Sequence, residues 1–454
     1  MNLGADTLRW GGAVFTPDNE ELSAQMGSGV FEEGNAWRTA YMNTLRLRSY
    51  QSPNPAPPNN DYIVADESRC YLTGDNGVIP AEEMKMNYLK TEQHKHITKT
   101  IKTAYGDIYD CTLIYKQPGL NHPLLKNHKV QMRPGKEVYD ALNKKNAKGG
   151  RRKQVKVELD EGCPPGTVPI RRITQYNFSK DSTTTTTTSI FNSSRRLAQL
   201  ATSYGFEFAG IQTAKGAAGQ YLGAAASMSV WNPKLNGAHQ YSSSLIIVES
   251  FDHSNLIHVG WTVNPDVYGD SLTHHYLLWT ADNYKTTGCF NTHCPGFVQT
   301  SSTTPIDSTI TDISIRGKVQ RHFTVEVTLD SAAQWWLLLG GTPVGYWPNN
   351  VFKGMNLGAD TLRWGGAVLT PDNEELSAQM GSGAFKEGSA WRTAYMNTLR
   401  VRSYQSPNPA PPNNNYIVAD ESRCYLTGDN GVIPGTVDDY VFCYGSRIRN
   451  GQCI

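Results

Sequence analysis

Cysteine and histidine are the residue types whose spacing in this chain could support covalent or metal chemistry. The chain has eight cysteines, an even number, and Cys289 and Cys294 lie five positions apart in the turn-rich stretch GCFNTHC. This spacing predicts a short disulfide loop. The alternative is a zinc site, but structural zinc ligands usually come as two close pairs, and no second close pair lies nearby. We therefore expect disulfides, which indicate an oxidising, extracellular compartment.

Neighbouring histidines occur in two places, in HKH at residues 94–96 and in HH at residues 274–275. Neighbouring side chains of a strand point to opposite faces, so we do not expect these histidines to hold a metal ion. The chain also lacks the HExxH zinc motif, the Walker phosphate loop, the dinucleotide fingerprint and the GxSxG elbow of serine hydrolases. The sequence thus predicts neither a metal nor an organic cofactor.

The charge and hydropathy of the chain give no reason to expect a nucleic acid or membrane partner. The 42 basic and 41 acidic residues leave a formal net charge of +1, too little to attract a polyanion. The basic run NKKNAKGGRRKQVK has no aromatic residues between its charges, so we interpret it as a solvated linker. The longest apolar runs, SLIIV and WWLLL, are far shorter than the roughly 18 residues of a spanning helix.

Two features of the sequence bear on export, and they point in different directions. Asn177 and Asn192 begin Asn-X-Ser triplets, which are candidate glycosylation sites and agree with an exported, disulfide-bonded protein. The first residues, MNLGADTLRW, have neither the basic start nor the apolar stretch of a secretory signal. We therefore expect a secreted type of protein, in a chain that begins without a signal peptide.

The elements that must position any site are partly duplicated. Residues 1–80 align without gaps to residues 355–434 and differ at six positions. Such a recent copy is unlike the diverged units of a solenoid, and it indicates either a tandem-gene fusion or a gene model that runs across two neighbouring genes. Only one set of partner strands, about residues 203–350, is present for the two copies. We expect the second copy, which the short connector NNVFKG joins to that set, to complete the fold. The first copy should then be loosely folded, with unpaired strand edges.

Composition divides the rest of the chain into a small module, a tether and a large β domain. Residues 81–175 are rich in Lys, His and Pro and predict short extended pieces, and residues 176–192 contain the low-complexity run STTTTTTS. Residues 192–204 predict a helix. Beyond them, short β-branched and aromatic runs separated by turn residues predict an antiparallel β-sandwich over residues 193–454. The predicted strands include residues 204–213, 222–231, 244–250, 256–263, 274–281, 296–301, 313–320, 322–329, 335–340, 361–369 and 393–404.

Several long motifs resemble one known family. GDIYDCTLIYKQPGLNHPLLKNHKVQMRP and CPPGTVPIRR resemble the activation peptide of the neprosin family, plant glutamic peptidases that cleave at proline. LIHVGWTVNPDVYGD, WTADNYKTTGCFNTHCPGFVQ, PVGYWP, WGGAV and QMGSG resemble the catalytic domain of that family. The resemblance covers nearly everything from about residue 98 to the end. It implies a mainly β, glutamic-peptidase-like sandwich, preceded by an activation-peptide module, with a groove for an extended peptide.

The resemblance also implies two catalytic glutamates, and this chain has neither. In the family one glutamate lies in an I-E-A-G-W strand and the other in a W-G-G-E strand, and the matching positions here are His258 and Ala367. Peptide hydrolysis needs one group to take a proton from water and another to stabilise the carbonyl oxygen and protonate the leaving amine. An imidazole can act as a base, but a methyl group does neither. The first copy has Ala13 at the second position, so it offers no replacement.

Other residues are candidates for a substitute acid or for the groove. Glu249 ends the strand before His258, and in a hairpin the two would be diagonal neighbours on one face. Glu374 and Glu375 follow the WGGAV strand in what reads as a polar turn. For the groove, the resemblance points to Trp261, Tyr268, Trp364 and Gln379, although core packing is the alternative for most of the aromatic residues. We expect disulfides Cys111–Cys163, Cys289–Cys294 and Cys424–Cys453, and we leave open whether Cys70 and Cys443 pair with each other.

The sequence therefore predicts a secreted-type neprosin homologue in which both catalytic positions are substituted. We expect it to bind extended or proline-containing peptides, or a cell-wall glycoprotein, with its own activation module as a further partner. Two alternatives stay open. One is an active prolyl endopeptidase that uses His258 and a substitute carboxylate, and the other is a fused gene product without a settled role.

Overall fold

The computed structural model describes a set of ranges that together hold most of the predicted sandwich. These ranges are 62–65, 70–74, 77–80, 96–138, 154–172, 205–214, 219–237, 239–371, 375–385, 392–406, 416–419, 422, 424–432 and 440–453. They belong to two compact units, Met1–Lys95 with Ser182–Ser189, and His96–Asp181 with Ile190–Ile454. The two candidate glycosylation sites, the Thr-rich run and the predicted helix at 192–204 lie outside the described residues.

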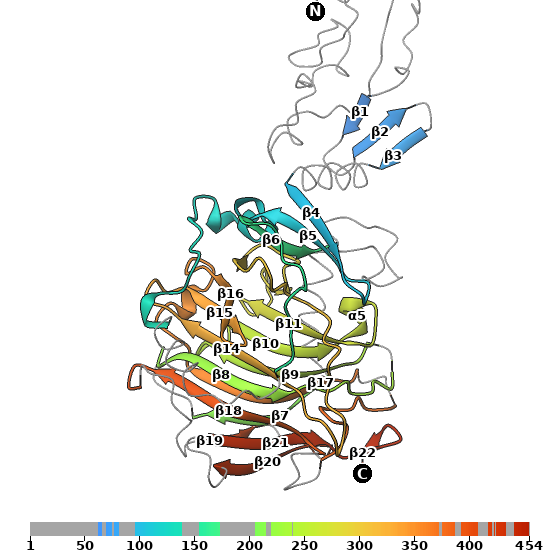
Figure 1. Ribbon diagram of the computed structural model, residues 1–454, viewed down its shortest axis with the longest axis vertical. Helices are drawn as coiled ribbons and strands as arrows, with labels where there is room; N and C mark the ends of the chain where they lie inside the picture. The colour runs from blue at the N-terminus through green and yellow to red at the C-terminus, as the bar shows by residue number, and fades with distance from the viewer. Residues whose placement is uncertain are drawn as a thin grey trace, which may run out of the picture. The chain divides into compact units, whose positions relative to one another are not determined.

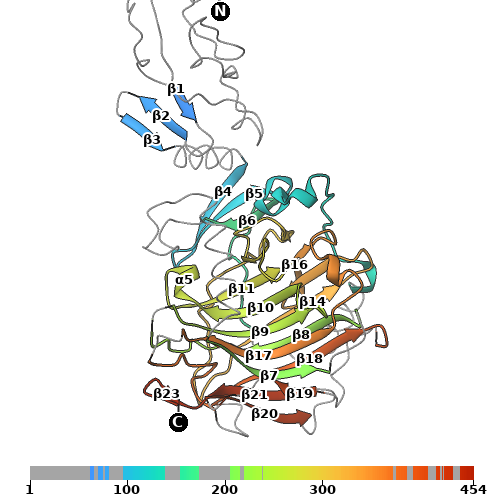
Figure 2. The same ribbon diagram turned by 180° about the vertical axis from the view of Figure 1, so that it is seen from behind.

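The larger unit contains two large antiparallel sheets, whose strands run side by side in Figures 1 and 2. Runs of β-branched and aromatic residues form these strands because their side chains pack well on a pleated surface. The first sheet has seven strands, in the order β12 (Cys289–Phe290), β11 (Thr273–Thr280), β10 (Leu256–Val263), β9 (Tyr241–Glu249), β17 (Thr361–Leu369), β7 (Phe206–Thr213) and β19 (Tyr416–Ala419).

The second sheet has eight strands. Their order is β13 (Val298–Gln299), β16 (Thr342–Trp347), β15 (Trp335–Leu339), β14 (His322–Leu329), β8 (Tyr221–Ser229), β18 (Ala394–Ser403), β21 (Tyr440–Ser446) and β20 (Tyr425–Val432). The predicted mainly β, antiparallel fold is therefore confirmed. One predicted strand, residues 313–320, is wrong: a turn at Gly317, with φ of +71°, reverses the chain there, and the Ile315 N–H donates to the Val319 carbonyl.

The main hydrophobic core lies between the two sheets. Alternate residues of each strand point into it, so that β10 contributes Ile257, Val259 and Trp261, all fully buried. Two hydrogen bonds cross from one sheet to the other: the Tyr444 hydroxyl donates to Ser244 Oγ at 2.6 Å, and Trp261 Nε1 donates to the Ser229 carbonyl at 3.0 Å. The opposite face of the seven-stranded sheet therefore points away from this core, and it carries a second apolar cluster.

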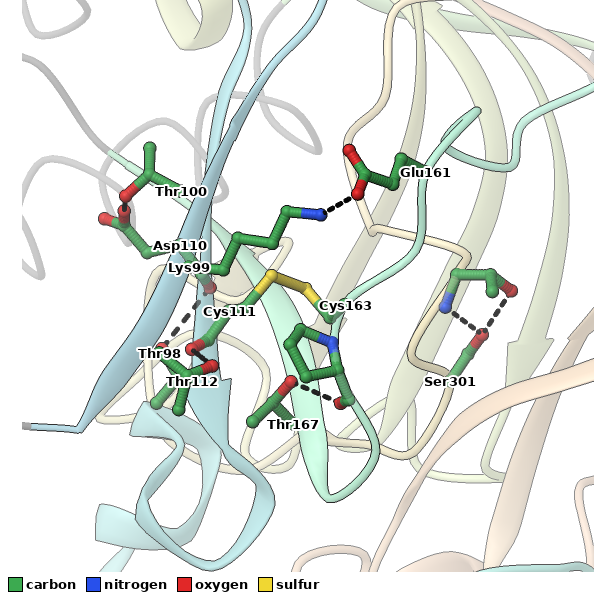
Figure 3. Close-up of a disulfide and its surroundings, with 12 residues drawn as sticks. Thr98, Lys99, Thr100, Asp110, Cys111, Thr112, Glu161, Cys163, Thr167 and Ser301 are labelled. Atoms are coloured by element: carbon green, nitrogen blue, oxygen red, sulfur yellow. Dashed lines mark hydrogen bonds and ion pairs between the residues drawn. A yellow bond between two sulfur atoms is a disulfide. The ribbon is translucent and has the colours of Figure 1, made fainter.

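A small three-stranded sheet is formed by the predicted module, in the order β4 (Ile97–Lys102), β5 (Ile108–Leu113) and β6 (Thr167–Arg171). Prolines break the segment after β5 into three short 3-10 turns, η2 (Ile114–Lys116), η3 (Pro118–Asn121) and η4 (Pro123–Leu125). A disulfide between Cys111 in β5 and Cys163 ties the strands to the loop before β6, and an ion pair between Lys99 and Glu161 lies beside it (Figure 3).

The cysteine pairs agree with the sequence-based expectations. Besides Cys111–Cys163, disulfides join Cys289 to Cys294 and Cys424 to Cys453. Cys443 is buried in β21. Three disulfides are consistent with an extracellular protein.

The second copy of the duplicated segment completes the sandwich, as expected. It supplies β17 and β19 to the seven-stranded sheet and β18 and β20 to the eight-stranded sheet. In the smaller unit, the first copy contributes β1 (Tyr62–Ala65), β2 (Cys70–Gly74) and β3 (Gly77–Pro80), which form a three-stranded sheet with one another. Residues 62–80 and 416–434 have the same sequence, so one sequence takes two different sets of strand partners.

Short elements complete the larger unit. They are α5 (Pro265–Tyr268), η6 (Lys353–Met355), β22 (Ile448–Arg449) and β23 (Gln452–Cys453). Within the described ranges, no helix has the length and apolar character needed to cross a membrane.

Candidate functional site

His258 and Ala367 lie on the same face of the seven-stranded sheet. His258 is in β10 and Ala367 in β17, the two strands that flank β9. Ile247 of β9 pairs with His258, whereas Ser243, four residues away on the same face, pairs with Ala367. Both positions therefore point away from the main core, and the two residues line one pocket. The local sequence produces this arrangement because each strand alternates between its two faces.

The pocket is lined mainly by aromatic and hydroxyl side chains. Its lining residues are Phe206, Tyr241, Ser243, Leu245, His258, Thr262, Asn264, Tyr276, Leu278, Phe290 and Ala367. No aspartate or glutamate is among them. The free space is about 10 Å³, close to the least that one water molecule needs. In this conformation the pocket can hold a water but not a peptide side chain.

The His258 imidazole is kept neutral by its surroundings. It is 4% exposed. Burial lowers its pKa to about 3, and the nearby positive charge of Arg363 acts in the same direction. Transfer of the charged ring into a poorly solvated site is costly, so the proton is released instead. A base with so low a pKa takes a proton from water only weakly at neutral pH.

Ala367 lies beside a chain of hydroxyl groups that hydrogen-bond to one another. The Ser243 hydroxyl donates to Thr262 Oγ1 at 2.8 Å, and the Thr262 hydroxyl is 3.2 Å from the Ser242 carbonyl that can accept from it. Burial raises the pKa of Tyr276, against the effect of its hydrogen bond with Ser243. These groups are neutral at ordinary pH, so they can orient a water or a peptide carbonyl without supplying an acid or a base of the required strength.

Glu249, the candidate substitute, is near His258 in the fold but engaged elsewhere. Strands β9 and β10 form a hairpin in which Glu249 pairs with Leu256, two positions from His258 on the same face. Its carboxylate contacts His253 Nδ1 and lies 3.7 Å from the Nε atom of Arg363. Glu249 is not among the pocket-lining residues. Of the other two candidate carboxylates, Glu374 lies outside the described residues and Glu375 is not among the residues that line the pocket.

Two of the predicted groove residues lie in the core instead. Trp261 follows His258 by three positions, and Trp364 precedes Ala367 by three. An odd spacing in a strand places two side chains on opposite faces, so both tryptophans point into the main core, where they are fully buried. The assignment of these two to the groove is therefore corrected.

The other two groove candidates lie outside the pocket lining. Tyr268, at the end of α5, stacks in parallel on His274 with 3.8 Å between ring centres. Gln379 is half-buried in a loop, and its side chain accepts a hydrogen bond from the Lys234 N–H at 3.2 Å. Sequence reasoning did not single out Tyr241, Tyr276 and Phe290 of the lining. The signal that could have found them is strand alternation, because each lies at an even spacing from a pocket residue of its own strand or of the paired strand.

No group of three or more histidine, cysteine or carboxylate side chains that could hold a metal ion occurs in the part of the chain that the structure describes. The neighbouring residues His274 and His275 point to opposite faces of β11, which is the arrangement expected from strand geometry.

Comparisons with known proteins identify both parts of the chain. The family model described as Neprosin matches residues 1–88 and 238–446, and the model described as Neprosin activation peptide matches residues 100–212. Among solved structures, the chain is similar to scytalido-glutamic peptidase with a transition state analog inhibitor, with 11% identity over 52% of this chain and 97% of that chain and a TM-score of 0.30. It is also similar to SCP-B, a member of the Eqolisin family of peptidases, in a complex with a tripeptide. The identity is 10%, the match covers 53% of this chain and 96% of that chain, and the TM-score is 0.27.

Proposed function

The chain belongs to the neprosin family, and from this premise we propose that it is a catalytically impaired homologue that binds extended peptides, including proline-containing ones, without cleaving them. The proposed ligand is a secreted peptide or a cell-wall glycoprotein. The observation that carries the proposal is the pocket shared by His258 and Ala367, because its lining keeps aromatic and hydroxyl groups but contains no carboxyl group.

The loss of chemistry follows from what the two side chains can do. Ala367 neither gives nor takes a proton, and His258 has a pKa lowered to about 3 by burial. Losing one general acid or base typically costs about 10² to 10⁴ in rate, and the two roles act together. Cleavage at the family's rate is therefore not expected from this pocket.

The lining also supports binding of a proline ring. Phe206, Tyr241, Tyr276 and Phe290 present aromatic surface, on which a proline ring packs well. The free space is water-sized, so a ligand enters only after a lining side chain moves. Phe206 is half-buried at the start of β7, which makes it the lining residue with most room to move.

The second candidate function is an active prolyl endopeptidase that uses His258 with Glu249. The hairpin register favours it, because Glu249 is diagonal to His258 on one face. Turnover of a proline-containing peptide by the purified, acid-treated protein, abolished in His258→Ala, would support this candidate. Absence of turnover combined with saturable peptide binding would support the binding function.

Restoring both acids provides the sharper test. We expect the double variant His258→Glu with Ala367→Glu to hydrolyse a proline-containing peptide at least about 100-fold faster than either single variant, because the two roles act as a unit. Product is measured by mass spectrometry. The matched control is Ser244→Glu with Ala367→Glu, which carries the same added charge with one acid on the core face. A folded double variant that stays inert would mean that the pocket itself no longer presents a peptide correctly.

A further inference from the structure

A second polar cluster lies where the three-stranded sheet meets the sandwich, and none of its residues lines the pocket. Arg171, the last residue of β6, pairs with Tyr109 of β5, so both side chains point from the same face of that sheet. Tyr109 is fully buried, and the Arg171 side chain is 10% exposed. A guanidinium group is thus held almost entirely out of water between the two parts.

The contacts of this guanidinium come from both parts. Arg171 Nη2 donates to Asp107 Oδ1 of the module at 2.7 Å, and Nη1 donates to the Asp307 carbonyl of the sandwich at 2.8 Å. Its Cζ atom lies 5.4 Å from the centre of the Tyr268 ring, a distance at which a cation is attracted by the ring face. The second oxygen of Asp107 accepts a hydrogen bond from the Thr309 hydroxyl at 2.7 Å, which links the module to the sandwich again.

The aromatic wall of this site is also held by contacts that do not involve Arg171. The rings of Tyr268 and His274 stack at 3.8 Å with an angle of 1° between their planes. The Tyr268 hydroxyl donates to the His275 carbonyl at 3.3 Å, and His274 Nε2 lies 2.9 Å from Asp270 Oδ1. His274 Nδ1 faces Arg171 Nη1 at 3.5 Å.

Asp307 closes the site on the side of the sandwich. It is fully buried in a left-handed backbone conformation, with φ of +70°. Its carboxyl group takes part in a side-chain hydrogen bond with Tyr109, and its negative charge favours the charged form of Arg171. Burial raises its pKa to about 8, against the lowering effect of Arg171, and Asp107 and Tyr109 are the other titratable groups that act on it.

We propose that Asp107, Asp307, Tyr268 and His274 form a guanidinium-binding socket, in which Arg171 is the resident ligand and which a free guanidinium compound or an arginine of another peptide occupies when Arg171 is removed. A guanidinium group has five N–H donors in a plane, which suits a site with the Asp107 carboxylate, the Asp307 carbonyl and a ring face. An ammonium group is a compact charge and matches this set poorly. The proposal does not depend on what the pocket at His258 binds.

Arg172, the residue that follows Arg171, provides a matched control for the removal of Arg171. It is also an arginine bonded to an aspartate, with Nε donating to Asp110 Oδ2 at 2.8 Å. Both residues belong to the module, and the Arg172 side chain is 37% exposed. Its removal therefore takes away an arginine and an ion pair without emptying a site against the sandwich.

The test is chemical rescue of the full-length protein with the side chain removed. We expect Arg171→Ala to lower the thermal unfolding midpoint by at least about 5 °C, because it leaves buried charges unpaired. Millimolar ethylguanidinium should restore most of that loss, whereas ethylammonium at the same concentration should not. Wild-type protein and Arg172→Ala should respond to neither compound. Binding of ethylguanidinium to Arg171→Ala, measured by calorimetry, should weaken about tenfold when Asp107→Asn is added.

Each outcome decides the proposal. Equal responses to the two compounds, or equal rescue of Arg171→Ala and Arg172→Ala, would overturn it. If Arg171→Ala is insoluble, its refolding yield is measured in both compounds: recovery in ethylguanidinium alone supports the socket, and recovery in neither, or in both, rejects it. Arg171→Lys should remain destabilised, since the lysine ammonium cannot contact Asp107 and the Asp307 carbonyl with the same geometry.

Discussion

At the scale of single residues, His258 shows how a change of one side chain alters the chemistry of a whole pocket. The same buried face that can hold a glutamate at an elevated pKa holds an imidazole at a lowered one, because desolvation always favours the neutral form. Such a site keeps a carboxyl group protonated and able to donate a proton at neutral pH, whereas it makes an imidazole a weaker proton acceptor. An imidazole at this position is therefore not chemically equivalent to a carboxyl group.

The neutral state of His258 leads to a prediction about acid stability. The unfolded imidazole takes up a proton near its ordinary pKa of 6.5, but the folded one does so only near pH 3, so acidification within this window favours unfolding. We expect His258→Gln to lose less stability than the wild type across the window, by up to about 1 kcal/mol per pH unit. The free energy of unfolding in urea, measured at several pH values, checks this.

A stability profile of His258→Gln that stays parallel to that of the wild type between pH 3 and pH 6.5 would contradict this prediction. It would show that water reaches the His258 ring and that the pocket is open in solution.

Sequence reasoning singled out His258 and Ala367 but could not assemble the pocket around them. Period-two alternation would have excluded Trp261 and Trp364 from the face of His258 and Ala367, since the spacing of three is visible in the sequence. The lining residues that come from other strands could not be found in this way. Tyr276 and Phe290 join the lining because β11 lies beside β10 and β12 beside β11, and local sequence patterns do not give strand order or register.

At the scale of secondary structure, the edge strand β13 is completed by a side chain rather than by another strand. Gln117, between η2 and η3, donates through Nε2 to the Gln299 carbonyl at 2.9 Å and accepts from the Gln299 N–H at 2.7 Å. The amide of glutamine has the same donor and acceptor as a peptide group, so it replaces one rung of a β-ladder. It also anchors the module to the sandwich.

This substitute rung predicts a large cost of mutation. Gln117→Ala leaves the buried N–H and carbonyl of Gln299 without their partner, which should lower the free energy of unfolding by about 2–5 kcal/mol. The matched control is Gln154→Ala, because Gln154 is exposed and its amide donates to Thr324 Oγ1 at 3.0 Å. That change should cost less than about 0.5 kcal/mol. Similar losses for both variants in urea titrations would contradict the role of Gln117.

Most strands were predictable from hydropathy, and the exceptions have physical causes. Residues 256–263, 322–329 and 361–369 match β10, β14 and β17 over their whole length, because each is an uninterrupted apolar or alternating run between turn residues. Residues 313–320 have the same kind of composition, but Gly317 permits a tight turn within the run. No local pattern predicts that Gln117 would act as part of a sheet, since its partner is 182 positions away.

At the scale of the whole molecule, the duplication provides two versions of one segment, of which the larger unit uses the second. Four of its strands, β17 to β20, come from residues 355–434, and β17 lies inside the seven-stranded sheet, between β9 and β7. A central strand has partners on both sides, so its loss cannot be tolerated in the way that loss of an edge strand can.

Two deletions of nearly identical sequence should therefore have opposite effects. Removal of residues 1–80 should leave the main thermal unfolding transition unchanged, because all strands of both large sheets remain. Removal of residues 355–434 should abolish that transition, since β17 and β18 are lost. Differential scanning calorimetry and limited proteolysis would measure both. Loss of the transition in the first deletion would mean that the first copy contributes to the stability of the larger unit.

The repeated stretch YIVADESRCYLTGDNGVIP has a consequence for spectroscopy. In residues 62–80 it forms β1, β2 and β3, whereas in residues 416–434 its first strand pairs with β7 and its second with β21. Each position of this stretch other than the proline should give two amide resonances, one from each copy, with different chemical shifts and different exchange rates with solvent. A single sample thus holds the same nineteen residues in two environments, and any difference between the paired signals reports context alone.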